Sequence, residues 1–344
     1  ACYLLEEEQV LKSEGNYQAA LIAFEKAQEL YAQHHQWKRA IHCVIELAKL
    51  ADNFDAAEPK IKYGNLSLQL AQKHLPKNHV LTASAFRQKA EAMMMIESLD
   101  SANYYLLKAI PIFKQQNDWE NLGWSEVLIG YNHFNQYQLK DCQKHYQNVS
   151  QLLQVQNFTQ ETQIEIHSTL LSLRGLLYER QGDYDKAIQN TKEALQLDIA
   201  KGVHSEKDSS FISDYYNSLG AYYYYKGDYQ RAMDNYMQSL NSYSNASQNP
   251  TILSNIGELL KKQNDYIKSI EYLKESLKFS SHQTKMEILQ GLGGSFSKLG
   301  LMDSAVYYLQ EATQLPTNYR KPIALSLMGN LYKSASQLNK PFDN

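Results

Sequence analysis

Residues 216–239 read YNSLGAYYYYKGDYQRAMDNYMQS, and the rest of the chain repeats this pattern with variations. Two apolar helical faces flank the turn sequence Lys226-Gly227-Asp228. Glycine readily adopts the backbone conformation that ends a helix, and aspartate is a preferred cap at the start of the next one. The stretch therefore predicts two antiparallel helices joined by a short turn.

Small residues in this stretch indicate where the two helices meet. Gly220 and Ala232 stand at the positions where the helix axes are expected to approach closely, because larger side chains would force the helices apart. Tyrosines such as Tyr223 and Tyr236 are expected to fill the space on either side. The pattern requires packing from these residues and no chemistry.

The order Leu219-Gly220, Tyr223, Gly227, Tyr229, Ala232 and Tyr236 resembles the tetratricopeptide repeat, a helix-turn-helix unit of about 34 residues. The resemblance implies an all-α fold, a right-handed superhelical solenoid of antiparallel helix hairpins. Similar stretches recur along the chain, so we predict one solenoid over residues 1–344 with about eight repeats and a terminal helix. The predicted repeats lie near 1–35, 36–76, 79–116, 119–155, 160–202, 208–245, 250–281 and 284–315, and the terminal helix spans 318–338.

The spacing of the repeats is longer than usual. The positions that match Tyr229 are separated by 36 to 45 residues, against about 34 in the family. Long periods, tyrosine-rich helices and the phrase His74-Leu75-Pro76-Lys77-Asn78-His79 are similar to bacterial arrays that precede caspase-like CHAT protease domains or histidine kinase domains. In such proteins the array senses a partner and controls the catalytic domain. The chain lacks an initiator methionine and stops abruptly at Asn344, so we expect a module of a larger protein.

Composition argues against several classes of partner. The net charge is −3, with 34 basic and 37 acidic side chains, which gives no electrostatic footprint for nucleic acid or an anionic membrane. The three cysteines are widely separated, which disfavours a disulfide framework or a zinc site and fits a reducing compartment. No apolar run approaches the roughly 18 residues of a spanning helix. We expect a cytoplasmic protein.

Catalytic and metal-binding patterns are weak throughout. The sequence contains no HExxH pair, no Walker-type loop and no dinucleotide fingerprint. Cys142 and His145 have a spacing compatible with a nucleophile and its base, but no orienting group or oxyanion loop accompanies them. Cys142 also stands where other repeats have alanine, which favours a core position. We therefore expect no enzymatic activity, no cofactor and no metal from these residues.

The first helix of each hairpin is expected to line the concave face of the solenoid, where a partner would bind. Helical periodicity around the packing glycines selects the side chains that should face this groove. Trp124, Tyr131 and Phe134 are the expected anchors, because large aromatics dominate binding hot spots, although aromatics at helical spacing also suit a core. The full set of candidate partner-binding residues is Arg87, Glu91, Trp124, Tyr131, Phe134, Asn217, Tyr224, Glu258, Lys261 and Asn330.

These observations favour a protein- or peptide-binding regulatory or sensor module that recognises a partner segment in its concave groove. The alternative is a stand-alone scaffold for multiprotein assembly. Paired basic residues of the kind that clamp a terminal carboxylate are missing from the groove positions, since Asn217 has no basic partner in its helix and Arg87 stands beside Glu91. An exposed aromatic segment would also suit self-association.

Overall fold

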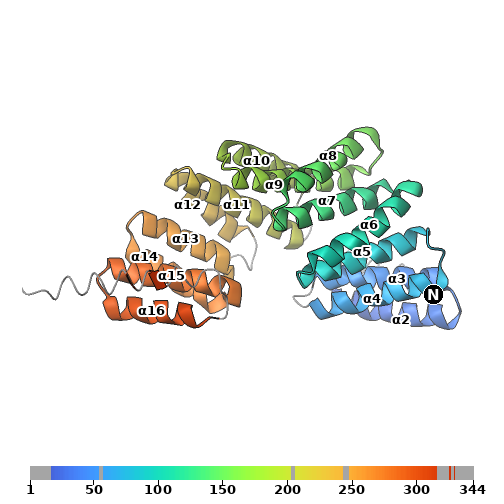
Figure 1. The fold of residues 1–344 in the computed structure, drawn as a ribbon, viewed down its shortest axis with the longest axis horizontal. Helices are drawn as coiled ribbons and strands as arrows, with labels where there is room; N and C mark the ends of the chain where they lie inside the picture. Colours follow the sequence, from blue (N-terminus) through green and yellow to red (C-terminus); the bar gives the residue numbers. More distant parts are fainter. Residues whose placement is uncertain are drawn as a thin grey trace, which may run out of the picture. The chain divides into compact units, whose positions relative to one another are not determined.

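The computed structural model describes residues 17–53, 57–202, 206–242 and 248–315, together with 325, 326 and 329. Over these residues the chain forms fifteen α-helices and one short 3-10 helix, with no strand (Figure 1). The predicted all-α solenoid of helix hairpins is therefore confirmed. Most of the predicted terminal helix 318–338, including Asn330, lies outside the described residues.

The helices follow one another with short connections. In chain order they are α2 (Tyr17–Gln33), α3 (Trp37–Leu50), η1 (Ala51–Asn53), α4 (Ala57–His74), α5 (Val80–Met95), α6 (Leu99–Gln115), α7 (Trp119–Asn135), α8 (Leu139–Val155), α9 (Gln160–Arg180), α10 (Tyr184–Lys201), α11 (Glu206–Tyr225), α12 (Tyr229–Asn241), α13 (Pro250–Lys262), α14 (Tyr266–Phe279), α15 (His282–Lys298) and α16 (Met302–Gln314).

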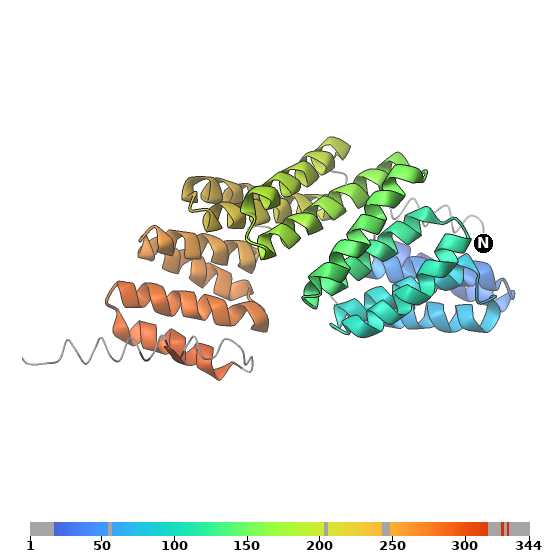
Figure 2. The same cartoon turned by 45° about the horizontal axis from the view of Figure 1, so that its top comes forward.

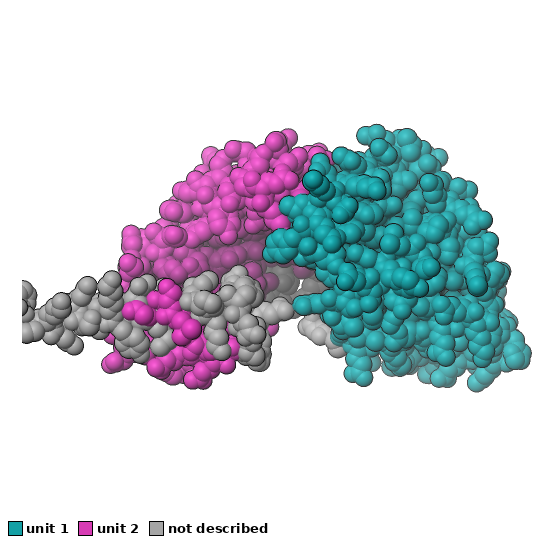
Figure 3. All heavy atoms as spheres, in the orientation of Figure 1, with its two compact units in different colours: residues 1–173 teal, residues 174–344 magenta. Residues whose placement is uncertain are grey.

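The chain divides into two compact units, residues 1–173 and residues 174–344, coloured separately in Figure 3. Within each unit a helix packs against the next helix in sequence, and some first helices also contact the first helix of the next hairpin, as α5 contacts α7 and α13 contacts α15. Figures 1 and 2 show α11 to α16 side by side in chain order from both directions. Contacts that are confined to the same hairpin and the adjacent hairpins are characteristic of a solenoid. That the whole chain acts as a single domain stays a prediction.

The turn of the opening stretch forms as its sequence indicates. α11 ends at Tyr225 and α12 begins at Tyr229. Gly227 has a φ of +80°, a left-handed conformation that glycine adopts without a steric penalty. The Asp228 carboxylate accepts a hydrogen bond from the Arg231 backbone N–H at 3.2 Å and so caps α12.

The glycines inside the first helices make room for one large side chain of the second helix. A Cβ atom added at Gly220 would lie 2.5 Å from the Tyr236 ring, which is closer than real Cβ contacts allow. The side chain that lies over Gly220 is thus Tyr236, while Ala232 is fully buried nearby in sequence. The same separation of 16 residues recurs in the pairs Gly130 and Tyr146, Gly175 and Thr191, Gly257 and Leu273, and Gly293 and Leu309.

A second repeated position, three residues after the start of a second helix, is fully buried throughout the described second helices and is small in all of them except α4, where it is Lys60. It holds alanine in most hairpins and Cys142 in one of them. Cys142 has no exposed surface, which confirms its predicted place in the core. The small members of this set are Ala20, Ala102, Cys142, Ala187, Ala232, Ser269 and Ala305.

Candidate functional site

The predicted partner-binding residues that the structure describes lie on four first helices. In the first unit these helices are α5 and α7, and in the second unit they are α11 and α13. Each unit is therefore considered by itself.

On α5, Arg87 and Glu91 take part in an ion network around a buried lysine. The Lys60 side chain is fully buried, and its Nζ atom lies 2.8 Å from Glu91 Oε2 and 2.8 Å from Asp52 Oδ1. The same ammonium donates to Gln88 Oε1 at 3.0 Å. A buried charge without partners would be strongly destabilising, so these acceptors are needed to keep Lys60 inside the protein.

The charges around Glu91 set its ionisation. Burial by itself raises the pKa of the Glu91 carboxyl, but the positive charges of Lys60 and Arg87 outweigh burial and hold that pKa below its usual range. Arg87 Nε lies 3.5 Å from Glu91 Oε1. Both side chains are mostly buried, at 12% and 19% exposure, so they stabilise the first unit whether or not they also face a partner.

On α7 the three predicted aromatic anchors differ in exposure. Tyr131 is 38% exposed, Trp124 is half-buried, and Phe134 is only 6% exposed. Tyr131 follows Gly130, the glycine on which the Tyr146 ring rests. In this conformation Tyr131 and part of Trp124 are accessible to a partner, whereas Phe134 belongs to the packed interior.

α7 and α8 also share a polar cluster, of which the sequence analysis named only His145. Glu126 is 9% exposed, and its Oε2 atom lies 2.6 Å from His145 Nδ1 and 3.1 Å from Asn148 Nδ2. The His133 and His145 rings stack with centroids 5.3 Å apart. The cluster joins α7 to α8 and satisfies a buried carboxylate, which gives His145 a structural role.

On α11, Asn217 is linked to the next first helix. Asn255 Nδ2 on α13 donates to Asn217 Oδ1 at 2.9 Å. Tyr224, one residue before the end of α11, packs against Tyr225 and Tyr229, with ring centroids 5.5 and 5.9 Å away. Burial, followed by the nearby charge of Glu258, raises the pKa of Tyr224 to about 12, so its hydroxyl stays protonated and can donate a hydrogen bond at neutral pH.

On α13, Glu258 and Lys261 form a partly exposed ion pair with 2.6 Å between Oε2 and Nζ. The pair lies against glycines of the following first helix, α15. A Cβ atom at Gly291 would be 2.5 Å from Glu258 Oε1, and one at Gly294 would be 3.9 Å from Lys261 Nζ. Polar side chains of α11 and α13, together with the glycines of α15 that they lie against, thus form one row across three hairpins of the second unit.

Asn255, Gly291 and Gly294 extend the predicted set. Asn255 was missed because it stands one position away from the residue that helical periodicity selects on α13. Gly291 makes room for the Glu258 carboxylate, whereas only Lys261 lies within 4 Å of a Cβ atom added at Gly294, so a partner backbone can approach closely there. Gly291-Leu292-Gly293-Gly294 was visible in the sequence as an unusually glycine-rich helix segment.

Two negative findings apply to the residues that the structure describes. No group of three or more His, Cys, Asp or Glu side chains is arranged to hold a metal ion there. No helix in the same ranges combines the length and the hydropathy needed to cross a membrane.

Family models named tetratricopeptide repeat match residues 165–245, and also residues 9–34 and 250–282. Among solved structures, the apo form of the quorum sensor NprR from B. thuringiensis aligns with a TM-score of 0.67 and 14% identity, over 92% of this chain and 87% of that one. A Signal Transduction ATPase with Numerous Domains protein with a tetratricopeptide repeat sensor, from Pyrococcus horikoshii, aligns with a TM-score of 0.60 and 18% identity, over 90% of this chain and 45% of that one.

The apo form of RapI aligns with a TM-score of 0.58 and 12% identity, over 83% of this chain and 97% of that one. At such identities these likenesses concern the fold alone. A comparison with curated proteins found no match.

Proposed function

Since the chain is a tetratricopeptide-repeat protein, we propose that it is a regulatory or sensor module that binds a segment of a partner protein along the first helices of its hairpins. The observation that carries this proposal is the polar row of the second unit. It runs from Asn217 on α11 over Asn255, Glu258 and Lys261 on α13 to Gly291 on α15.

The chemistry of this row suits an extended or helical peptide. Asn217 and Asn255 present carboxamides, which can both donate to and accept from a peptide backbone. Glu258 and Lys261 are 36% and 25% exposed, so the ion pair can exchange partners with charged side chains of a ligand. The Tyr224 hydroxyl adds a donor, and Gly294 of α15 leaves room for a backbone.

The first unit offers an aromatic surface for partner binding. Tyr131 and Trp124 on α7 supply the large, rigid contact area that is typical of binding hot spots. We retain Tyr131 as the principal anchor because it is the most exposed of the three predicted aromatics. Arg87, Glu91 and Phe134 are expected to act mainly by supporting the helices that carry the surface.

We further propose that the module belongs to a larger signalling or protease protein. The descriptions of NprR as a quorum sensor and of the Pyrococcus horikoshii protein as one with a tetratricopeptide repeat sensor support a sensor role. The association with a CHAT protease or histidine kinase domain and the cytoplasmic location stay predictions. The alternative, a stand-alone scaffold, would bind partners without changing the activity of any attached domain.

A site-specific crosslinking experiment tests the binding face. A photo-reactive phenylalanine analogue replaces Tyr131 in one protein and Tyr307 in another, because Tyr307 is a 57% exposed tyrosine on the second helix α16. Irradiation in an extract of the source cells should crosslink a protein to position 131 and not to position 307. Equal crosslinking at both positions, or none at position 131, would reject binding by the first helices.

A further inference from the structure

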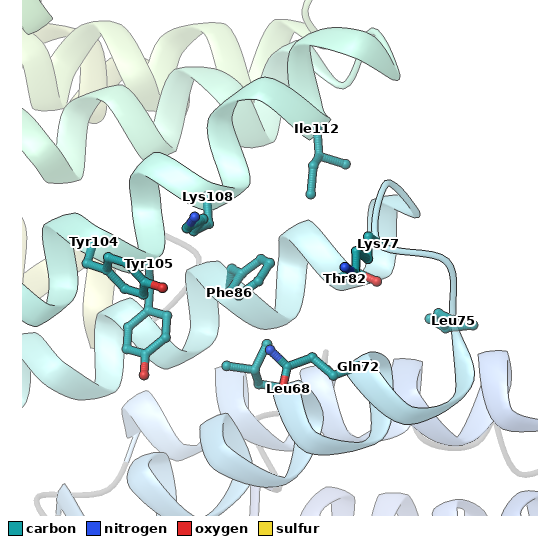
Figure 4. Close-up of a pocket in the computed structure, with 10 residues that line it drawn as sticks. All are labelled: Leu68, Gln72, Leu75, Lys77, Thr82, Phe86, Tyr104, Tyr105, Lys108 and Ile112. Carbon is teal, nitrogen blue, oxygen red and sulfur yellow. The ribbon is translucent and has the colours of Figure 1, made fainter.

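A pocket of about 640 Å³ lies in the first unit, between α4 and α6 and above α5. Figure 4 shows Phe86 of α5 between side chains that come from α4 and side chains that come from α6. Both α4 and α6 are second helices of their hairpins and both pack on α5. Although Thr82 and Phe86 belong to α5, none of the partner-binding residues proposed above lines the pocket, so the two sites are separate.

Aromatic rings form the centre of this pocket, and they contact one another. The Phe86 and Tyr105 rings stack with centroids 6.3 Å apart, and Tyr104 meets Tyr105 edge-on at 5.3 Å. Leu68 and Ile112 add aliphatic walls from α4 and α6. Such a preformed apolar centre can bind one large side chain, and the pocket residues lose little conformational entropy when it binds.

The charged residues of the pocket have one sign. Its lining contains Lys77 and Lys108 and includes no Asp or Glu. Lys108 Nζ lies 5.4 Å from the Tyr104 ring centroid. Across the described residues neither lysine has a salt bridge or a side-chain hydrogen bond, whereas Lys60, Lys62 and Lys89 nearby in sequence each have an acceptor. The two ammonium groups are available to a negatively charged ligand.

The rim of the pocket is open. Gln72, Lys77, Tyr104 and Lys108 are all exposed, with Tyr104 at 57%. Pockets for small molecules usually bury about 70–90% of the surface of the ligand. A pocket with an open rim would leave more of a small ligand exposed to solvent. A segment of a larger partner meets this geometry better, because the body of the partner covers what the rim leaves exposed.

We propose that this pocket binds an acidic peptide segment of a partner protein, which places one large apolar side chain against Phe86 and its carboxylates near Lys77 and Lys108. The charge complementarity between an acidic segment and two unpaired lysines determines the orientation. The aromatic centre determines the preference for a large apolar residue.

The test begins with selection from a random seven-residue peptide library displayed against the intact chain. Selected peptides should combine a large apolar residue with Asp or Glu, and a fluorescein-labelled selected peptide should bind saturably by anisotropy. Lys108→Glu should weaken that binding at least tenfold, and Tyr104→Ala should also weaken it. Lys114→Glu is the matched control, because Lys114 is exposed on the same helix and does not line the pocket.

Three results would overturn the inference. One is a selection that yields no peptides with both an acidic and a large apolar residue. Another is an equal effect of Lys108→Glu and Lys114→Glu on the binding of selected peptides. The third is a loss of binding in Tyr131→Ala, which would place the peptide on the first helices instead. Circular dichroism of Lys108→Glu, at an exposed position, checks that the variant folds.

Discussion

Five glycines of the first helices show how single residues determine helix packing in this chain. Each lacks the Cβ atom that would collide with the residue 16 positions later, at separations of 2.4 to 2.6 Å. The sequence allowed the glycines to be identified as close contacts. It did not reveal which side chain lies over them, since Tyr, Thr and Leu all fill the same place. The filling residue depends on the volume available between two particular helices.

Two adjacent glycines in α15 provide a matched test of this packing. A Cβ atom at Gly293 would lie 2.5 Å from Leu309, whereas one at Gly294 has only Lys261 within 4 Å. Gly293→Ala should lower the free energy of unfolding by about 1–3 kcal/mol through overpacking. Gly294→Ala should raise it by up to about 1 kcal/mol, since alanine is the better helix former. Urea denaturation measures both. Equal effects would show that Leu309 does not lie over Gly293.

Glu91 shows where sequence reasoning about the site was incomplete. Helical periodicity selected Arg87 and Glu91 as groove residues, but Lys60, their buried partner, comes from another hairpin and lies 31 residues before Glu91. Local periodicity carries no information about such a contact. The network that stabilises the first unit therefore became visible only in the structure.

The ionisation of Glu91 predicts a pH-dependent stability. Glu91→Gln should cost about 3 kcal/mol at neutral pH, because it leaves part of the charge of Lys60 unpaired in the interior. The folded-state pKa of Glu91 lies below its unfolded value, so the parent gains this stability above about pH 4.3. The difference between parent and variant should shrink as the pH falls through the folded-state pKa.

Thermal or urea unfolding at several pH values measures this difference. Glu58→Gln is the control, since Glu58 is an exposed residue of α4. A stability loss in Glu91→Gln that stays constant from pH 7 to pH 3 would contradict the proposed role of the charge.

At the scale of the helices, the turns between them share one conformation but not one residue. Gly182, Gly227 and Gly300 have positive φ, and so do His35, Glu97, Asn117, Tyr137 and Asn264 at the equivalent place, two residues before the next helix. A positive φ can be predicted from sequence at a glycine. At Glu97 and Tyr137 it cannot, because these side chains disfavour the conformation and the flanking helices impose it.

Substitutions at Gly227 test the turn. Gly227→Ala should lower the free energy of unfolding by about 1–2 kcal/mol, because a Cβ atom is disfavoured at a φ of +80°. Gly227→Asn should cost less, since asparagine tolerates this region and occupies the equivalent position in two other turns. Denaturant titration distinguishes them, and a Gly227→Ala protein as stable as the parent would contradict the observed turn.

Pro111 illustrates a limit of prediction for whole helices. Proline inside a helix usually kinks or ends it, yet α6 continues through Pro111 to Gln115. The ring removes the hydrogen bond to the carbonyl four residues earlier, at Leu107. Leu107 and Pro111 are both exposed, so water can take the place of the missing donor. Whether a helix continues through a proline thus depends on the solvent exposure of that turn, which the sequence alone does not reveal.

At the scale of the molecule, the fold was predictable and the binding surface only in part. Recurring small residues and turn signals are enough to indicate a tetratricopeptide array, because each hairpin packs mainly on its sequence neighbours. The surface depends on exposure and on contacts between hairpins. Tyr131, Asn217, Glu258 and Lys261 follow from periodicity. The place of Asn255 in the polar row, the burial of Phe134 and the pocket above Phe86 do not.

The central claim is that a partner binds along the first helices, and a matched pair of tyrosine substitutions tests it most directly. The partner identified by crosslinking is titrated against the parent, Tyr131→Ala and Tyr307→Ala. Tyr131→Ala should weaken binding by roughly 30-fold, about 2 kcal/mol, as expected for an aromatic anchor, and Tyr307→Ala should leave it within twofold of the parent. Equal losses in the two variants, or an unchanged affinity in Tyr131→Ala, would contradict the claim.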